Sequence, residues 1–183
     1  MNDLALVKKY MAMVKSGKYT FRYIKNYGNK LIASGVNLNI QGDNGLTLLN
    51  LSIKMNDYKL SKYFIDLGIN INVSDYDYNA PIHNAILNNN LDLVKLLIES
   101  GADKELVTVF EQTPLHLAVN NGNLDIVKYL VQSGANINIV DENNNSAIDY
   151  AIDEKDKEII KYFLSLGMDE DHRLVMESII KKG

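Results

Sequence analysis

Two histidines, His83 and His116, are the side chains of this 183-residue chain best suited to acid–base chemistry or zinc binding. They lie 33 residues apart. Ligands of one zinc ion sit about 2 Å from the metal, whereas packed helices lie about 10 Å apart. If the two histidines occupy neighbouring helices, they cannot share an ion. We therefore predict no metal site.

Two acidic segments, 75–79 and 141–145, begin with the Asp-x-(Asp/Asn)-x-Asn pattern of calcium loops. In such a loop the sixth position is glycine and the twelfth is a bidentate glutamate. The first segment has Ala80 and Ile86 at these positions, and the second departs at the same two places. Both segments are therefore predicted to be turns and not cation sites.

Other catalytic patterns are missing from the sequence. It has no cysteine, and it contains no glycine-rich phosphate loop, no G-x-S-x-G and no H-E-x-x-H. The adjacent carboxylates of Asp153 and Glu154 fit a solvated helix surface. We predict that the chain is not an enzyme and uses no cofactor.

The candidate residues are placed by an internal repeat. Glycines recur every 33 residues, at Gly35, Gly68, Gly101, Gly134 and Gly167. Both prolines and both histidines 83 and 116 keep the same interval, as do two apolar columns. A period of this length indicates a solenoid in which each unit packs on its neighbours. Such a protein presents a long surface, so recognition is a more natural function than catalysis.

The copy from Thr113 to Asn138 shows how one unit folds. Thr113 is a suitable helix N-cap, and Pro114 suits the first helical position. A short helix is predicted to stop near Gly122, and a second, amphipathic helix to end at Gly134, which needs a positive φ. The polar stretch that follows favours a hairpin-like finger.

This unit, with TPLHLA and IVKYLVQSGANIN, resembles the ankyrin repeat. The likeness implies an all-α, ankyrin-like solenoid in one domain spanning residues 1–183. We assign residues 1–40 to a divergent N-terminal repeat and 169–183 to a C-terminal capping helix. The repeats between them are 41–73, 74–106, 107–139 and 140–168.

The resemblance also implies roles for particular residues. His83 and His116 occupy the histidine of TPLH, which in the family pins the first helix to its neighbour. Family members bind proteins through finger tips and first helices, so a partner-binding surface is expected here. Its predicted residues are Tyr76, Asp77, Asn79, Val109, Phe110, Gln112, Asn143, Met55, Asn88 and Asn121. Tyr76, Val109 and Phe110 are the predicted apolar anchors, and the alternative is that Phe110 folds back onto its own hairpin.

Charge and composition limit the partners. The net charge is −4, so no general attraction to nucleic acid is expected, although residues 1–30 carry +6 and residues 141–171 carry −7. We predict a monomeric, cytoplasmic protein–protein interaction module whose partner is unidentified and which binds neither nucleic acid nor membrane. Two alternatives remain open. One is a regulatory inhibitor or host-directed effector acting from the host cytosol through the same surface; the other is a nucleic-acid binder using the basic N-terminal end.

Overall fold

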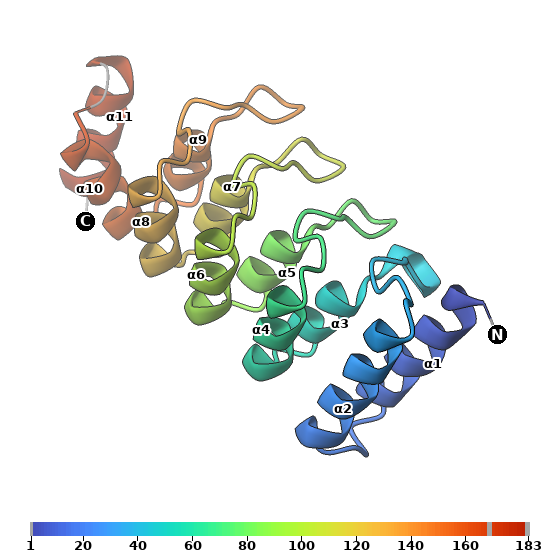
Figure 1. Ribbon diagram of the computed structural model, residues 1–183. Coiled ribbons are helices and arrows are strands. Elements are labelled where there is room, and N and C mark those ends of the chain that lie inside the picture. The colour runs from blue at the N-terminus through green and yellow to red at the C-terminus, as the bar shows by residue number, and fades with distance from the viewer. Residues whose placement is uncertain (1, 168–169, 182–183) are drawn as a thin grey trace. The chain divides into compact units, whose positions relative to one another are not determined.

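The computed structural model describes residues 2–167 and 170–181, and this part of the chain is built from helices (Figure 1). It contains no strand, only an isolated antiparallel bridge between Val140 and Ser146. The helices are α1 Asp3–Lys15, α2 Phe21–Ala33, the 3-10 turn η1 Asp43–Gly45, α3 Leu48–Lys54, α4 Tyr58–Asp66, α5 Pro81–Leu87, α6 Leu91–Glu99, α7 Pro114–Asn120, α8 Leu124–Gln132, α9 Ala147–Asp153, α10 Lys157–Ser165 and α11 Glu170–Lys181.

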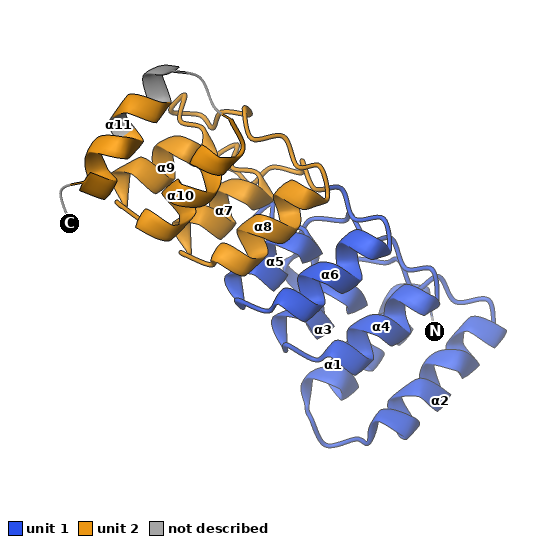
Figure 2. Cartoon of the chain, turned by 90° about the vertical axis from the view of Figure 1, so that its left-hand side faces the viewer, with its two compact units in different colours: residues 1–103 blue, residues 104–183 orange. Residues whose placement is uncertain are grey.

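The chain divides into two compact units, residues 1–103 and 104–183 (Figure 2). In the first unit, α1, α3 and α5 pack side by side as an inner layer, and α2, α4 and α6 form an outer layer. In the second unit, α7 packs on α9, α8 packs on α10, and α11 contacts both α9 and α10. The loops that enter the inner helices form fingers at residues 41–46, 74–79, 107–112 and 140–145.

Local sequence signals set the ends of the helices. Pro81 and Pro114 each occupy the first helical position of an inner helix, as predicted. The outer helices α4, α6, α8 and α10 begin at Asp or Asn caps, such as Asn123, whose side chain accepts the N–H of Ile126 at 2.9 Å. Gly101 and Gly134 follow the outer helices with φ of 92° and 85°, which confirms the predicted left-handed positions.

The repeating apolar columns form the core. Phe64, Leu97, Leu130 and Phe163 are fully buried, one in each outer helix from α4 to α10. The column of small residues Ser52, Ala85, Ala118 and Ala151 is buried in the inner helices. Small side chains there allow close helix packing, so that within each unit neighbouring helix pairs bury their apolar faces against each other.

The N-terminal helix pair departs from the others and is locked by tyrosines. Helices α1 and α2 have 13 residues each, whereas later inner and outer helices have 7 and 9. The hydroxyl of buried Tyr10 donates to the carbonyl of Ile24 at 2.8 Å, and that of Tyr63 donates to the carbonyl of Lys25 at 3.0 Å. Both hydroxyls lie against Gly28, where a Cβ would be 2.5–2.6 Å from them. Glycine at 28 therefore permits the contact between α1, α2 and α4.

The C-terminal helix matches the predicted capping element in part. Helix α11 covers 170–181, while residues 169, 182 and 183 of the assigned 169–183 element lie outside the described residues. Met176 is fully buried, and Leu174 is exposed. One face of α11 therefore contributes to the core of its unit.

Candidate functional site

Carboxylates hold the turns of two fingers. One oxygen of buried Asp75 accepts the backbone N–H groups of Asp77 and Asn79, at 3.1 and 2.9 Å. Asp141 repeats this in its own finger, with Asn143 and Asn145 at 2.9 and 3.0 Å. The Asp-x-(Asp/Asn)-x-Asn pattern of segments 75–79 and 141–145 therefore forms Asx turns, in which the carboxylate accepts hydrogen bonds from the backbone that follows it.

The second oxygen of each aspartate lies against a side chain of an inner helix, as an ion pair at Asp75 and as a hydrogen bond at Asp141. Lys54 on α3 places its Nζ 2.7 Å from Asp75 Oδ2, although the carboxylate side chain is almost fully buried. In the last finger, Tyr150 donates its hydroxyl to Asp141 Oδ2 at 2.7 Å. Although burial alone raises the pKa of Asp141, the Tyr150 hydroxyl and the backbone N–H groups hold it below its ordinary value. Both turns are thus tied to an inner helix.

Neighbouring fingers are also tied to each other. In the first unit, Tyr76 N–H donates to the carbonyl of Asn44 at 3.1 Å, and the Tyr76 ring lies against Gly45. In the second unit, Glu142 N–H donates to the carbonyl of Phe110 at 3.4 Å. The backbone under Tyr76 and Phe110 is therefore fixed, so their side chains are presented without first having to order a loop.

The position of the TPLH histidine is filled by three residue types. In the four successive repeats the chain has Asn50, His83, His116 and Asp149 there. His83 and His116 each accept the N-cap N–H at 3.1 Å through Nδ1. Asp149 accepts the N–H of Ser146 at 2.8 Å, and Asn50 instead contacts the Thr47 hydroxyl at 2.6 Å. All four side chains thus hold the start of an inner helix.

His116 is the centre of a buried polar network. The network contains a histidine, a carboxylate and a hydroxyl, as many catalytic sites do, but its geometry is different. Its Nδ1 accepts the N–H of Thr113, so Nε2 carries the proton and donates to the carbonyl of Asn145 at 3.1 Å. Burial lowers the pKa of His116, with the Asn145 carbonyl and the Asp141 carboxylate acting in the opposite sense. The side chain is almost fully buried. Neither ring nitrogen is left for a substrate, and the role is that of a structural pin.

A ladder of Asn-x-Asn motifs joins successive repeats. Asn70 accepts the N–H of Asn72 at 3.0 Å and so closes a local turn. Asn72 then accepts the N–H of Asp103 at 3.0 Å, 31 residues along the chain. Asn39 and Glu105 make the same link, to the N–H groups of Asn70 and Asn136. Asn39, Asn72 and Glu105, which lie 33 residues apart, therefore have a common function.

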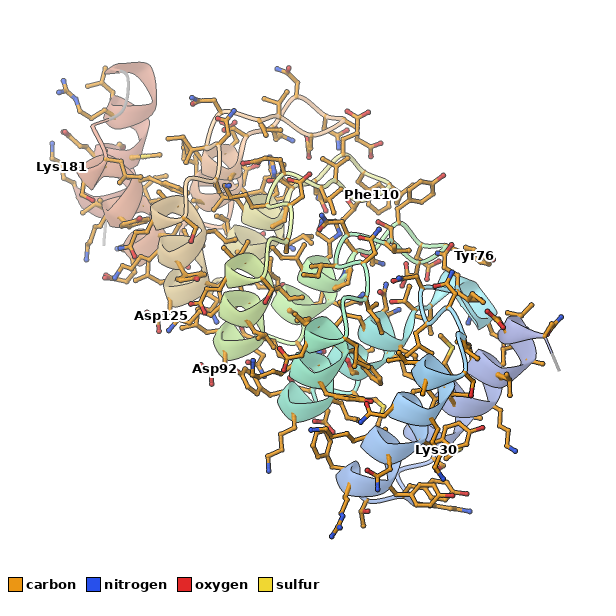
Figure 3. All side chains as sticks on the ribbon, viewed as in Figure 1. Lys30, Tyr76, Asp92, Phe110, Asp125 and Lys181 are labelled. Carbon is orange, nitrogen blue, oxygen red and sulfur yellow. The ribbon has the colours of Figure 1, made fainter. Side chains whose placement is uncertain are left out.

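Seven of the predicted partner-binding residues are exposed. Tyr76 is 70 % exposed, and Val109 and Phe110 are each 54 % exposed. Figure 3 labels Tyr76 and Phe110 on their fingers. The remaining four are Asp77, Asn143, Met55 and Asn121. The alternative that Phe110 is buried in its hairpin is thus wrong. In the first unit the finger carries Tyr76 and Asp77, while Met55 follows α3; in the second, one finger carries Val109 and Phe110 and the next carries Asn143.

Three predicted residues are half-buried and hold the framework. Asn88 donates its side-chain amide to the carbonyl of Ile53 at 2.6 Å, which joins the ends of α5 and α3. Gln112 donates to the Tyr150 hydroxyl at 2.6 Å. Asn79 closes the finger turn through its backbone. These contacts favour positioning roles for the three residues.

The predicted set omitted four exposed apolar residues of the fingers and inner-helix ends, namely Tyr78, Leu87, Val107 and Val140. Tyr78 is 61 % exposed and has a φ of 61°, a conformation unfavourable for a bulky side chain. The sequence did indicate this position, because Tyr78 aligns in the 33-residue repeat with Gly45, Glu111 and Asn144, which also have a positive φ. Leu87, at the end of α5, is 52 % exposed and lies beside the predicted Asn88.

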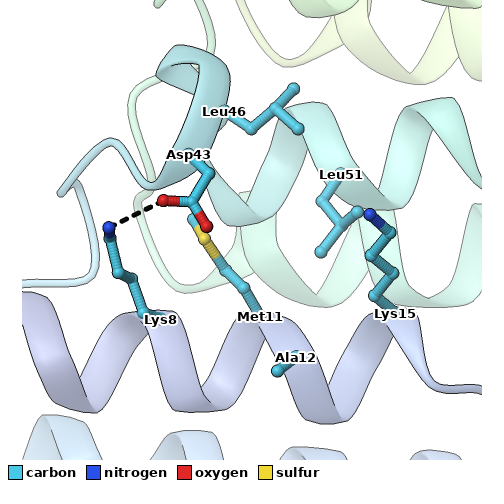
Figure 4. A pocket seen from close by; sticks show the side chains of 7 residues that line it. All are labelled: Lys8, Met11, Ala12, Lys15, Asp43, Leu46 and Leu51. Atoms are coloured by element: carbon cyan, nitrogen blue, oxygen red, sulfur yellow. Dashed lines mark hydrogen bonds and ion pairs between the residues drawn. The ribbon is translucent and has the colours of Figure 1, made fainter.

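A small cavity of about 150 Å³ lies between α1, the η1 turn and α3 (Figure 4). Met11, Leu46 and Leu51 give it an apolar lining, and Lys8 and Asp43 close one side as an ion pair of 2.7 Å. The Lys8 ammonium lowers the pKa of the Asp43 carboxyl. Sequence patterns did not indicate this cavity, because its lining comes from three segments.

Comparison with known families agrees with this architecture. A family model described as ankyrin repeats in three copies matches residues 13–108 and 82–173. The chain belongs to the ankyrin repeat family. Ankyrin repeats are generally protein–protein interaction modules and are typically non-enzymatic. No curated protein matches the chain.

Two features are absent from the described part of this ankyrin repeat chain. Across residues 2–167 and 170–181, no group of three or more His, Asp or Glu side chains is placed to hold a metal ion. Within the same described part, no helix is long and apolar enough to cross a membrane.

Proposed function

We propose that this ankyrin repeat chain binds a partner protein through exposed apolar side chains on its fingers. The anchors are Tyr76 and Tyr78 in the first unit and Val109 and Phe110 in the second. Large aromatic side chains that contact a partner are typical binding hot spots. Exposed apolar groups that cluster also mark interaction sites more often than isolated ones do.

The observation that carries the proposal is the exposure of aromatic rings on a fixed backbone. The Tyr76 backbone is bonded to the preceding finger, and that of Phe110 to the following one. Tyr78 retains a φ of 61° where a glycine would cost nothing. Strained residues concentrate at functional sites. A tyrosine kept at this position supports a role in contact with a partner. A regulatory inhibitor or host-directed effector would use the same side chains.

The test compares proteins captured by the immobilised full-length chain with those captured by variants, using quantitative mass spectrometry. Phe110→Asp and Tyr76→Asp should each weaken capture of a specific partner, by about 30-fold if the residue is a hot spot of roughly 2 kcal/mol. Both variants should keep the wild-type melting temperature, because the rings are exposed. Lys95→Ala, on the outer helix α6, serves as the control and should retain capture.

Two results would count against the proposal. One is a captured set that neither finger variant changes. The other is unfolding of Phe110→Asp, which would make the ring a packing residue. Loss of the same partner in both finger variants would assign both units to its binding.

A further inference from the structure

We propose that the outer face of the first unit carries a second docking site, which takes a short acidic protein segment with one bulky apolar side chain. The site is a groove between α2 and α4, called here the α2–α4 groove. Its volume is about 220 Å³, and it is lined by Phe21, Lys25, Tyr58, Lys59, Lys62, Tyr63 and Asp66. It involves none of the finger residues, so it goes beyond the proposed function.

Aromatic rings form the apolar part of the groove. Phe21 and Tyr58 are exposed at its two sides, while Tyr63 is buried. Phe21 and Tyr63 meet edge to face, with ring centroids 6.0 Å apart. Because the Tyr63 hydroxyl is bonded to the Lys25 carbonyl and Asn29, the groove has a fixed wall. Its volume is below the roughly 300 Å³ at which small-molecule sites begin. It suits one side chain of a larger partner.

Lysines determine the charge of that partner. The Lys25 ammonium lies 5.9 Å from the centre of the Tyr63 ring, and Lys62 pairs with Asp66 at 3.3 Å. Lys59 makes no ion pair with a described residue. The surrounding sequence is also basic: residues 1–42 contain seven Lys or Arg and a single acid, Asp3, which accepts the N–H of Asn37. Lys25 and Lys59 thus place positive charge beside an apolar groove. This arrangement complements a peptide segment in which acidic residues flank one apolar side chain.

The next cavity along the outer face favours a short peptide over a nucleic acid. That cavity shares Tyr58 with the α2–α4 groove but is lined by Asp92 and Glu99 as well as Lys95. A phosphate backbone running along the outer helices would meet these carboxylates. The exposed tyrosines nearby, Tyr19 and Tyr23, already stack on each other with centroids 5.0 Å apart. Each of these rings therefore has only one face left on which a base could stack.

The experiment measures fluorescence polarisation of a labelled peptide, EEDFEED, with the full-length protein. Saturable binding that weakens with added salt is expected. Lys59→Glu should weaken it about tenfold, because charge reversal replaces an attraction with a repulsion. Tyr58→Ala should weaken it by removing one side of the groove, and Phe110→Asp should have no effect. Lys30→Glu is the matched control: it makes the same change of net charge on α2 outside the groove, and it should leave most of the binding.

Four outcomes would overturn the proposal. Equal loss in Lys30→Glu and Lys59→Glu would mean diffuse attraction without a groove. Equal binding of EEDAEED would show that no apolar anchor is recognised. Tighter binding of oligothymidylate would show that the site prefers a nucleic acid to a peptide. Self-association of the wild type that Lys59→Glu abolishes in sedimentation would make a second copy the occupant.

Discussion

Replacement of Gly28 by alanine tests how the divergent N-terminal helix pair is held. In a helix interior alanine is favoured over glycine by about 1 kcal/mol, so propensity alone predicts stabilisation. The structure predicts the reverse. The new Cβ would lie 2.5 Å from Tyr10 Oη and 2.6 Å from Tyr63 Oη, well inside normal contact distance.

Neither hydroxyl can move without loss. Tyr10 is fully buried and bonded to Ile24, and Tyr63 is bonded to Lys25 and Asn29. Overpacking of this kind costs about 1–3 kcal/mol, and a displaced buried hydroxyl costs about 1–3 kcal/mol more. After the helix-propensity gain of about 1 kcal/mol, we expect Gly28→Ala to lower the free energy of unfolding by about 3 kcal/mol.

Urea unfolding followed by far-UV circular dichroism measures this change. Asn26→Ala, an exposed position on the same helix, is the control and should be neutral or slightly stabilising. Adding Tyr63→Phe to Gly28→Ala should cost less than the sum of the two changes, because the clash is with the hydroxyl. A Gly28→Ala protein as stable as wild type, or more so, would refute the packing explanation.

Three further predictions concern backbone strain and pH. Gly101→Val should lower the free energy of unfolding by at least about 1 kcal/mol in the same assay; since a Cβ there meets nothing within 4 Å, an unchanged value would show that φ of 92° imposes no strain. Tyr78→Gly and the matched Glu111→Gly should each raise the free energy of unfolding by about 1 kcal/mol, because both residues have a positive φ that glycine adopts without strain. Only Tyr78→Gly should weaken partner capture, and a loss of stability in both variants would contradict the left-handed assignment. The pKa of folded His116 is lowered by burial, so its stabilisation is complete above the unfolded pKa of about 6.5 and is lost as pH falls below it. His116→Asn should therefore show a shallower loss of stability than wild type between about pH 7 and pH 5, and identical slopes would be evidence against this titration.

Much of the fold could be predicted because it depends on local chemistry. Proline at the first helical position and glycine after a helix act on their own backbone, so Pro114 and Gly134 indicate boundaries in any context. The 33-residue register then supplies the stacking, since a single helix pair cannot bury its apolar face. The aspartates of the finger turns are equally local, because Asp141 bonds to residues two and four positions ahead.

For the proposed binding surface, the sequence indicated the fingers but not which of their residues are exposed. Asn88 and Gln112 have the right position in the repeat, but their side chains bond to Ile53 and Tyr150, which are 35 and 38 residues away. A polar residue in a surface column gives no sign of such a partner. Tyr78, in contrast, was missing from the predicted set. The equivalent position of a neighbouring repeat is a glycine, so an exposed aromatic side chain was not expected there.

The ladder of asparagines has a consequence for how such a chain can grow and diverge. Each link pairs a side-chain oxygen of one repeat, as at Asn72, with a backbone N–H of the next, as at Asp103. Every residue except proline supplies that N–H. A duplicated 33-residue segment would thus bring its own acceptor and find a donor already present, whatever amino acid follows. Mutation is constrained on one side of each junction and almost free on the other, which allows whole units to be gained or lost by unequal recombination without compensating changes in their neighbours.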